Sequence, residues 1–389
     1  MTENRYAWLD VIRGLSALTV CAAHLRAAVF EDYGTLENAG YSDRLFYFLT
    51  SLGHQSVMVF FVLSGFFVGG SILSQGKRFQ WRTYALARLS RLWVVLIPCL
   101  FLTLGIDLWF QACAPEIMQG AWQSMWRSGP NPDGSWSIGA SRFLANLFFL
   151  QTIETPVYGS NTPLWSLANE FWYYVLFPLI VMTAKTDTPS RPRVICTVLI
   201  ALLCYWLPMD MLALFSIWLL GAGVWWLTHR EMDLRRQRLF LLFGTGLTLA
   251  ALVLPQNTVF TVPYGLSRDL PLGISFAILL VGVTRLQTCH RAAHWITLAG
   301  RRLSDLSYSL YLCHLPIILA ISRFFIGETQ LRPSGSSYAL FVGFLAILVF
   351  IAWLLWLLFE RHTDFVRRRI LDFMGDHSKK TVIIPASPQ

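Results

Sequence analysis

Long apolar runs recur from one end of this chain to the other, and short polar segments separate them. A helix needs about 20 apolar residues to cross the hydrocarbon core of a bilayer. On this rule the sequence predicts ten membrane-spanning helices, at residues 8–29, 46–73, 84–111, 163–184, 193–207, 212–229, 237–254, 269–286, 305–326 and 337–360. A further apolar patch, Phe143 to Leu150, is too short to cross, and we expect it at the membrane interface or in a re-entrant segment. The pattern therefore predicts an all-α protein, a polytopic bundle of about ten transmembrane helices.

The composition agrees with this interpretation. Hydrophobic residues make up 55% of the 389 residues and charged residues only 14%, whereas soluble chains carry about a quarter charged residues. This balance excludes a disordered protein, a nucleic-acid-binding domain and a secreted disulfide scaffold. The seven cysteines are scattered and show no CxxC motif, so we expect neither disulfides nor a metal site.

The distribution of positive charge predicts the orientation. With the N-terminus in the cytoplasm, 23 of the 31 Lys and Arg residues fall in segments on the inner side, as the positive-inside rule requires. The sequence therefore predicts a bundle with both termini inside. We expect one membrane domain over residues 1–365, followed by a basic cytoplasmic tail, 366–389, that is disordered.

The first span carries three ionisable residues, Asp10, Arg13 and His24. Arg13 and His24 are eleven residues apart, which is about 20° beyond three full turns, so both side chains share one helix face. Asp10 lies one turn before Arg13 on that face. One interpretation is an interfacial ion pair and a structural histidine; because ionisable groups inside a membrane usually mark function, we favour a catalytic stripe with His24 near the outer side.

The third span begins with a second pair of charged residues, Arg88 and Arg91. Their i, i+3 spacing points both guanidinium groups the same way at the cytoplasmic end of the helix. Two guanidiniums can bind a phosphate through paired hydrogen bonds. The alternative is that they are ordinary topological anchors whose side chains extend to the interface.

Two later spans also contain polar residues. Asn169 and Glu170 lie in the first turns of the fourth span, and Tyr311 and His314 share a face of the ninth. These residues either form a substrate site or join helices through hydrogen bonds. His290 and His294 have the i, i+4 spacing of some metal sites, but the absence of a nearby carboxylate in sequence predicts no metal there.

Several motifs together resemble one family. They are Leu9-Asp10-Val-Ile-Arg13-Gly with His24 after ten intervening residues, Phe60-Phe-Val-Leu-Ser64-Gly-Phe, Arg88-x-x-Arg91, Trp165-Ser-Leu-x-x-Glu170 leading to Phe177-Pro, and Ser307-Tyr-Ser-Leu-Tyr311-Leu-x-His314-x-Pro. In this order the chain resembles the acyltransferase 3 family of bacterial integral-membrane O-acyltransferases, from Leu9 to about Arg369. It departs from the family pattern at Ala168-Asn169-Glu170-Phe171, where many members have Ser-Val-Glu-Glu, so that only one carboxylate remains, and at Cys313, where a tryptophan is usual.

The resemblance implies a function. It implies transfer of an acyl group, usually acetyl from acetyl-CoA, to a hydroxyl of a glycan, lipid-linked saccharide or small metabolite in the bacterial inner membrane. Arg13 and His24 then match the essential Arg/Lys–ten residues–His motif, and Arg88 and Arg91 match the CoA-phosphate site. No permanently bound cofactor is expected, because acyl-CoA is a substrate.

The residue chemistry suggests how such a reaction proceeds. His24 deprotonates the acceptor hydroxyl, and Arg13, Tyr311 or His314 donates to the developing oxyanion; an acyl-histidine relay is the alternative. Cytosolic CoA meets the basic inner face, while the acceptor comes from outside, where Trp122, Trp126 and Trp136 either stack on sugar rings or form a membrane belt. The competing class is a transporter or channel with a polar pathway formed by Arg13, His24, Glu170 and His314. The absence of sequence repeats argues against it.

Overall fold

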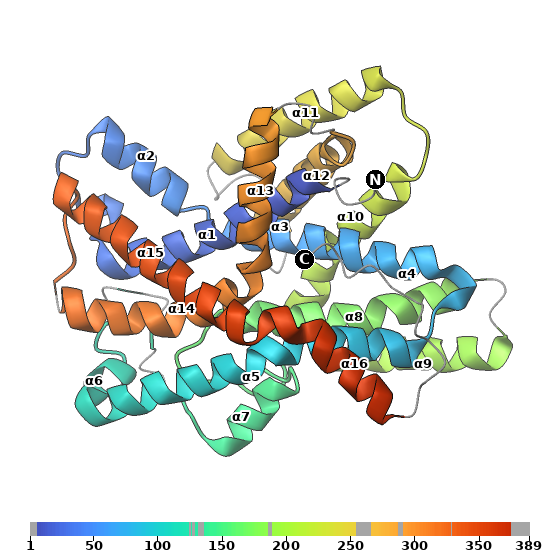
Figure 1. Cartoon of the computed structure of the whole chain (residues 1–389), viewed down its shortest axis with the longest axis horizontal. Coiled ribbons are helices and arrows are strands. Elements are labelled where there is room, and N and C mark those ends of the chain that lie inside the picture. The colour runs from blue at the N-terminus through green and yellow to red at the C-terminus, as the bar shows by residue number, and fades with distance from the viewer. Residues whose placement is uncertain are drawn as a thin grey trace.

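The described part of the chain consists of helices and the turns that join them (Figure 1). The structure, a computed structural model, describes residues 6–123, 126, 129–130, 136–185, 189–253, 266–286, 291–327 and 329–374. No β-strand occurs among these residues. The all-α fold class predicted from the hydrophobic pattern is therefore confirmed.

Each of the ten predicted spans coincides with a long helix or a run of helices. These are α1 (Ala7–Val29), the run α2 (Tyr41–Thr50), α3 (Gly53–Ser64), η2 (Gly65–Gly69) and α4 (Gly70–Gln75), α5 (Trp81–Cys113), α8 (Leu164–Ala184), α9 (Ser190–Trp206), α10 (Met209–Thr228), α11 (Leu234–Val253), α12 (Leu266–Val283), α14 (Ser307–Ile321) with η4 (Ser322–Ile326), and α15 (Gly335–Leu358). Within the described residues, seven of these segments are long and apolar enough to cross a membrane, and α9, α11 and α12 are not among the seven.

Shorter helices connect the long ones. They are η1 (Tyr33–Thr35), η3 (Gly76–Arg78), α6 (Pro115–Met118), α7 (Ala140–Leu147), α13 (Arg291–Asp305), η5 (Glu360–His362) and α16 (Thr363–Phe373). The apolar patch at Phe143 to Leu150 thus contains the end of α7. Residues 366–373 lie in the segment expected to be a disordered tail, but they form most of α16; the rest of that tail beyond 374 is outside the described residues.

Helix α1 lies at the centre of the bundle. It packs against α3, α13, α14 and α15, elements that come from both ends of the sequence. In Figure 1 the long helices α1, α3, α5, α8 and α14 run in similar directions, whereas α13 crosses them. This placement sets the charged stripe of α1 next to helices that carry the other polar motifs.

The contact between α3–η2 and α10 depends on two glycines. A Cβ atom at Gly65 would lie 1.8 Å from the carbonyl oxygen of Trp218, and one at Gly221 would lie 1.9 Å from that of Val62. Small residues let helix backbones approach closely in membrane bundles. The two glycines therefore fix the end of α3, where Ser64 lies.

A buried carboxylate holds the segment between α7 and α8 against α5. Asp107 is fully buried and accepts hydrogen bonds from the Ser160 backbone nitrogen at 2.8 Å, from the Ser160 hydroxyl at 2.7 Å and from the Trp136 indole at 3.3 Å.

Two tryptophans that the sequence places outside the membrane are buried: Trp122 and Trp126 are only 6% and 2% exposed. The expectation that these two rings stack on sugars is therefore wrong, because both pack into the core.

We predict that Gly221→Ala lowers the thermal stability of the protein in detergent, since the added methyl group collides with the Val62 backbone. Overpacking of this kind costs about 1–3 kcal/mol. Gly223→Ala, on the same helix, is the matched control, because nothing lies within 4 Å of the added atom. Equal unfolding temperatures for the two variants, measured by fluorescence-detected size-exclusion after heating, would contradict the close contact.

Candidate active site

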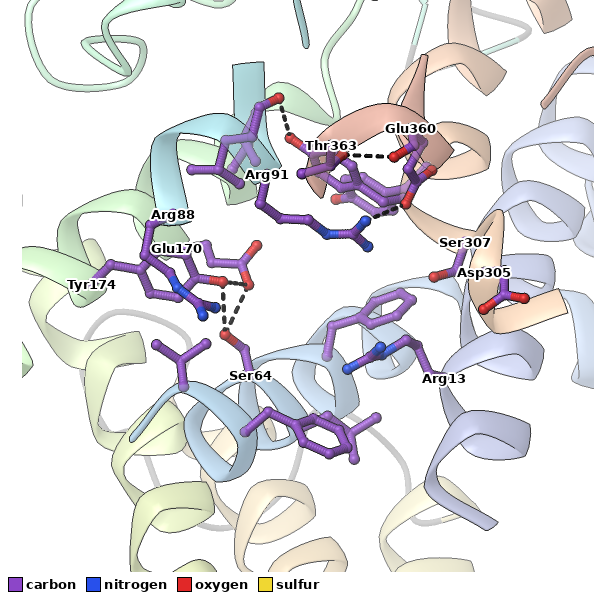
Figure 2. Close-up of a pocket in the computed structure, with 18 of the residues that line it drawn as sticks. Arg13, Ser64, Arg88, Arg91, Glu170, Tyr174, Asp305, Ser307, Glu360 and Thr363 are labelled. Carbon is purple, nitrogen blue, oxygen red and sulfur yellow. Dashed lines mark hydrogen bonds and ion pairs between the residues drawn. The ribbon is translucent and has the colours of Figure 1, made fainter. Parts of the chain in front are cut away.

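The polar residues of several helices meet in one cavity of about 200 Å³ (Figure 2). Its lining comes from α1, α3, η2, α5, α8, α14, the end of α13 and the segment from α15 to α16. The charged and hydroxyl-bearing side chains are Arg13, Ser64, Arg88, Arg91, Ser166, Glu170, Tyr174, Asp305, Ser307, Tyr308, Tyr311, Glu360, Arg361, Thr363, Asp364 and Arg367. The last four belong to the C-terminal segment that the sequence places at the cytoplasmic surface.

The cavity contains five of the nine residues proposed from the sequence. Arg13, Arg88, Arg91, Glu170 and Tyr311 line it. The other four, Asp10, His24, Asn169 and His314, are not among its lining residues. The first span, the arginine pair and the later polar motifs therefore contribute to one site region, although not all to one surface.

Arg91 has a buried acidic partner. Its guanidinium lies 2.8 Å from a carboxylate oxygen of Glu360, whose side chain is 1% exposed. Ser309 donates to the same carboxylate from its hydroxyl at 2.6 Å and from its backbone nitrogen at 3.2 Å. The charge of Arg91 is thus largely compensated.

Arg88 is placed differently. Its guanidinium carbon lies 5.8 Å from the ring centre of Tyr84 and 5.9 Å from that of Tyr174, and its Nε atom is buried without a hydrogen-bond partner. In the part of the chain that the structure describes, Arg88 forms no ion pair. The two arginines therefore do not form the parallel pair that their spacing predicted, because Glu360 draws Arg91 to the side (Figure 2).

Glu170 is the centre of a hydrogen-bonded group next to Arg88. Its carboxylate accepts from the Ser64 hydroxyl at 2.8 Å and from the Tyr174 hydroxyl at 2.5 Å. Ser64 in turn accepts from the Trp218 indole at 3.0 Å. These hydrogen bonds join helices α3, α8 and α10 at the depth of the cavity. The close contact of α3–η2 with α10 at Gly65 and Gly221 lies at the same depth.

Arg13 enters the cavity from the side opposite Arg88 (Figure 2). Its guanidinium carbon lies 4.8 Å from the ring centre of Phe67. Asp10, one turn earlier, is buried and accepts from the Ser304 hydroxyl at 3.3 Å. The structure thus gives Asp10 a hydrogen-bond donor on α13.

His24 and His314 form a pair beside the cavity. Nδ1 of His24 lies 2.9 Å from Nε2 of His314. Tyr311 connects this pair to the cavity, since it lines the cavity and its ring centre is 5.8 Å from that of His314. The Tyr311 hydroxyl is 2.6 Å from that of Ser166.

The sequence interpretation missed three residues that shape the site, Ser64, Tyr174 and Glu360. Ser64 stood in a quoted motif but without a role, and Tyr174 lies one turn after Glu170, a spacing that predicts contact on a helix. Glu360 is a lone carboxylate at the end of an apolar span, which is a detectable signal for a paired charge, although its partner Arg91 cannot be read from the sequence. Asn169 is buried outside the cavity lining, and the side chains of His290 and His294 are outside the described residues.

The fold and site define a multi-pass helical membrane protein with a charged cavity between its helices. The family model described as "Acyltransferase domain" (Acyl_transf_3) matches residues 6–360. The chain therefore belongs to this family and is a membrane acyltransferase. No curated protein and no solved structure is significantly similar to it.

We predict that Glu360→Gln destabilises the protein by about 1–3 kcal/mol, because Arg91, whose side chain is 37% exposed, loses its buried acidic partner. The control is Asp364→Asn, which breaks the more exposed Arg367–Asp364 pair and should cost less than about 1 kcal/mol. Thermal unfolding in detergent measures both. The double variant Arg91→Met, Glu360→Gln should recover part of the loss, and failure to recover any would show that Glu360 acts through Ser309 alone.

Proposed function

We propose that this protein transfers an acyl group, most simply acetyl, from acyl-CoA to a hydroxyl of a cell-surface glycan or lipid-linked saccharide. The observation that carries the proposal is the arrangement of the cavity: arginines line it, and Tyr311 joins it to the His24–His314 pair. An anionic donor and a general base are the two requirements of this reaction. Family membership supports the acyl transfer itself.

The donor site lies toward the C-terminal segment. CoA is a polyanion made in the cytosol, and positive charge near a binding site attracts such a ligand. Arg88 is the best-placed phosphate ligand, because its charge has no acidic partner in the described part of the chain and its planar group can donate two hydrogen bonds to one phosphate. Arg361 and Arg367 extend the positive lining toward the inner helix ends.

The chemistry takes place near Tyr311. A hydroxyl is a weak nucleophile at neutral pH. His24 therefore removes the proton of the acceptor hydroxyl while the hydroxyl oxygen attacks the thioester carbonyl. The oxyanion that develops needs a hydrogen-bond donor, and Arg13 and Tyr311 both line the cavity. An acyl-histidine intermediate on His24 is the alternative route if donor and acceptor bind in turn.

The acceptor class and the location in the bacterial inner membrane extend the family resemblance. A glycan or lipid-linked saccharide presents many hydroxyls, and its lipid carrier would place it within reach of a membrane-embedded base. With the N-terminus inside, His24 lies toward the outer end of α1, so the acceptor is expected from the outer face. The donor and the acceptor would then approach from opposite faces.

His24→Ala tests the proposed function most simply. We expect a loss of at least about 10²-fold in acyl transfer, within the range for removal of a general base, with normal amounts of protein in the membrane. Purified protein, radiolabelled acetyl-CoA and mass spectrometry of candidate acceptors provide the assay. His229→Ala is the control, because His229 is exposed at the end of α10; comparable activity of the two variants would remove His24 from the reaction.

Arg88→Lys and Arg91→Lys test the donor site. Lysine keeps the charge but loses the two-bond contact with phosphate, so both substitutions should raise the KM for acyl-CoA. The structure predicts the larger increase for Arg88→Lys, at least about tenfold, because Arg91 already pairs with Glu360. An unchanged CoA affinity in the double alanine variant would show that both residues are only topological anchors.

A further inference from the structure

The hydrogen bonds of His314 determine which of its ring nitrogens carries a proton. Its side chain is fully buried, and Nδ1 lies 2.7 Å from the carbonyl oxygen of Tyr311 and 3.2 Å from that of Leu310. A carbonyl oxygen only accepts hydrogen bonds. Nδ1 of His314 therefore bears a hydrogen.

The second nitrogen of His314 then fixes the direction of the contact with His24. The described polar contacts of the His314 ring are with two carbonyls and His24, and they include no carboxylate. A buried imidazolium without a carboxylate is costly, so His314 is neutral and its Nε2 is an acceptor. Nδ1 of His24, 2.9 Å away, must be the donor.

This direction leaves one free lone pair on His24. With its hydrogen on Nδ1, a neutral His24 ring has an unprotonated Nε2. We propose that His314 is a positioning residue that holds His24 in this tautomer, so that Nε2 is the atom that takes the proton of the acceptor. The proposal rests on the function proposed above, in which His24 is the general base.

With Nε2 of His24 as the base, every proton and bond of the transfer can be followed. The acceptor hydroxyl gives its proton to Nε2 of His24 while its oxygen forms a bond with the thioester carbonyl carbon. The carbon–sulfur bond then breaks, and the CoA thiolate leaves and takes up the proton from Nε2. The imidazolium that exists between these events keeps its Nδ1 hydrogen bond to His314, which stabilises its charge.

The same contacts exclude His314 as a hydrogen-bond donor to the oxyanion. The Nδ1 hydrogen of His314 is bonded to a backbone carbonyl and its Nε2 accepts from His24, so it has no hydrogen to offer an oxyanion. Of the three donors that the sequence suggested, Arg13 and Tyr311 are left, and the Tyr311 hydroxyl has to turn from the Pro163 carbonyl to donate to an oxyanion. Both line the cavity.

The tautomer can be measured without any assay of activity. In protein labelled with nitrogen-15 and carbon-13 at histidine, solid-state NMR distinguishes a ring protonated at Nδ1 from one protonated at Nε2. We expect the His24 signals, assigned by their loss in His24→Asn, to show a hydrogen on Nδ1 and a bare Nε2. A wild-type His24 with a bare Nδ1, or with both nitrogens protonated at neutral pH, would overturn the proposal even if acyl transfer is confirmed.

Kinetics of two variants test the consequence for catalysis. His314→Leu removes the nitrogen that accepts the hydrogen bond from His24, so His24 loses its preferred tautomer. The kcat should then fall about 10²- to 10⁴-fold. The KM for acyl-CoA should change less than about twofold, because His314 does not line the cavity. His314→Gln keeps an acceptor oxygen and a donor nitrogen, and it should recover at least about tenfold of the lost kcat.

The spectra and the kinetics together distinguish a positioning role of His314 from a purely structural role of this residue. They also distinguish it from failure of the proposed acyl transfer. A folded His314→Leu variant with wild-type kcat would overturn it, and so would equal losses in folded Leu and Gln variants. If the Leu variant does not fold, the wild-type spectrum and the Gln variant decide. If wild-type protein transfers no acyl group to any acceptor, the proposed function fails, and the spectrum still reports whether His314 sets the tautomer.

Discussion

Burying a charge between membrane helices costs free energy unless a partner or a polar cavity compensates it. This constraint accounts for the partners of the charged side chains that line the cavity. Glu360 and Ser309 compensate Arg91. Ser64 and Tyr174 hydrogen-bond Glu170. Arg88 lies beside the rings of Tyr84 and Tyr174 and forms no ion pair in the described part of the chain, so its charge can bind an anionic ligand.

The helices are arranged so that these compensated groups surround a single space. Gly65 and Gly221 bring α3 and α10 into backbone contact, and this contact places Ser64 where Trp218 and Glu170 both reach it. From there Tyr311 leads to the histidine pair. The proposed donor site and the proposed general base thus lie in neighbouring parts of one bundle.

The sequence predicted the helices well because hydropathy over a long window reports burial in lipid directly. It also identified Arg13, Arg88, Arg91, Glu170 and Tyr311, which meet in the cavity. It did not predict the partners of these residues, because pairs such as Arg91 and Glu360 depend on how distant helices are rotated against each other. The burial of Trp122 and Trp126 was missed for the same reason, and the His24–His314 contact joins residues 290 positions apart.

We propose that a cytosolic donor and an acceptor from the other face meet within the bundle at His24. Sealed vesicles of known orientation test it most directly, with radiolabelled acetyl-CoA supplied on the cytoplasmic side and the acceptor only on the opposite side. We expect labelled acceptor without any soluble acyl intermediate, and loss of labelling in His24→Ala. Labelling only when donor and acceptor are both on the cytoplasmic side would contradict it.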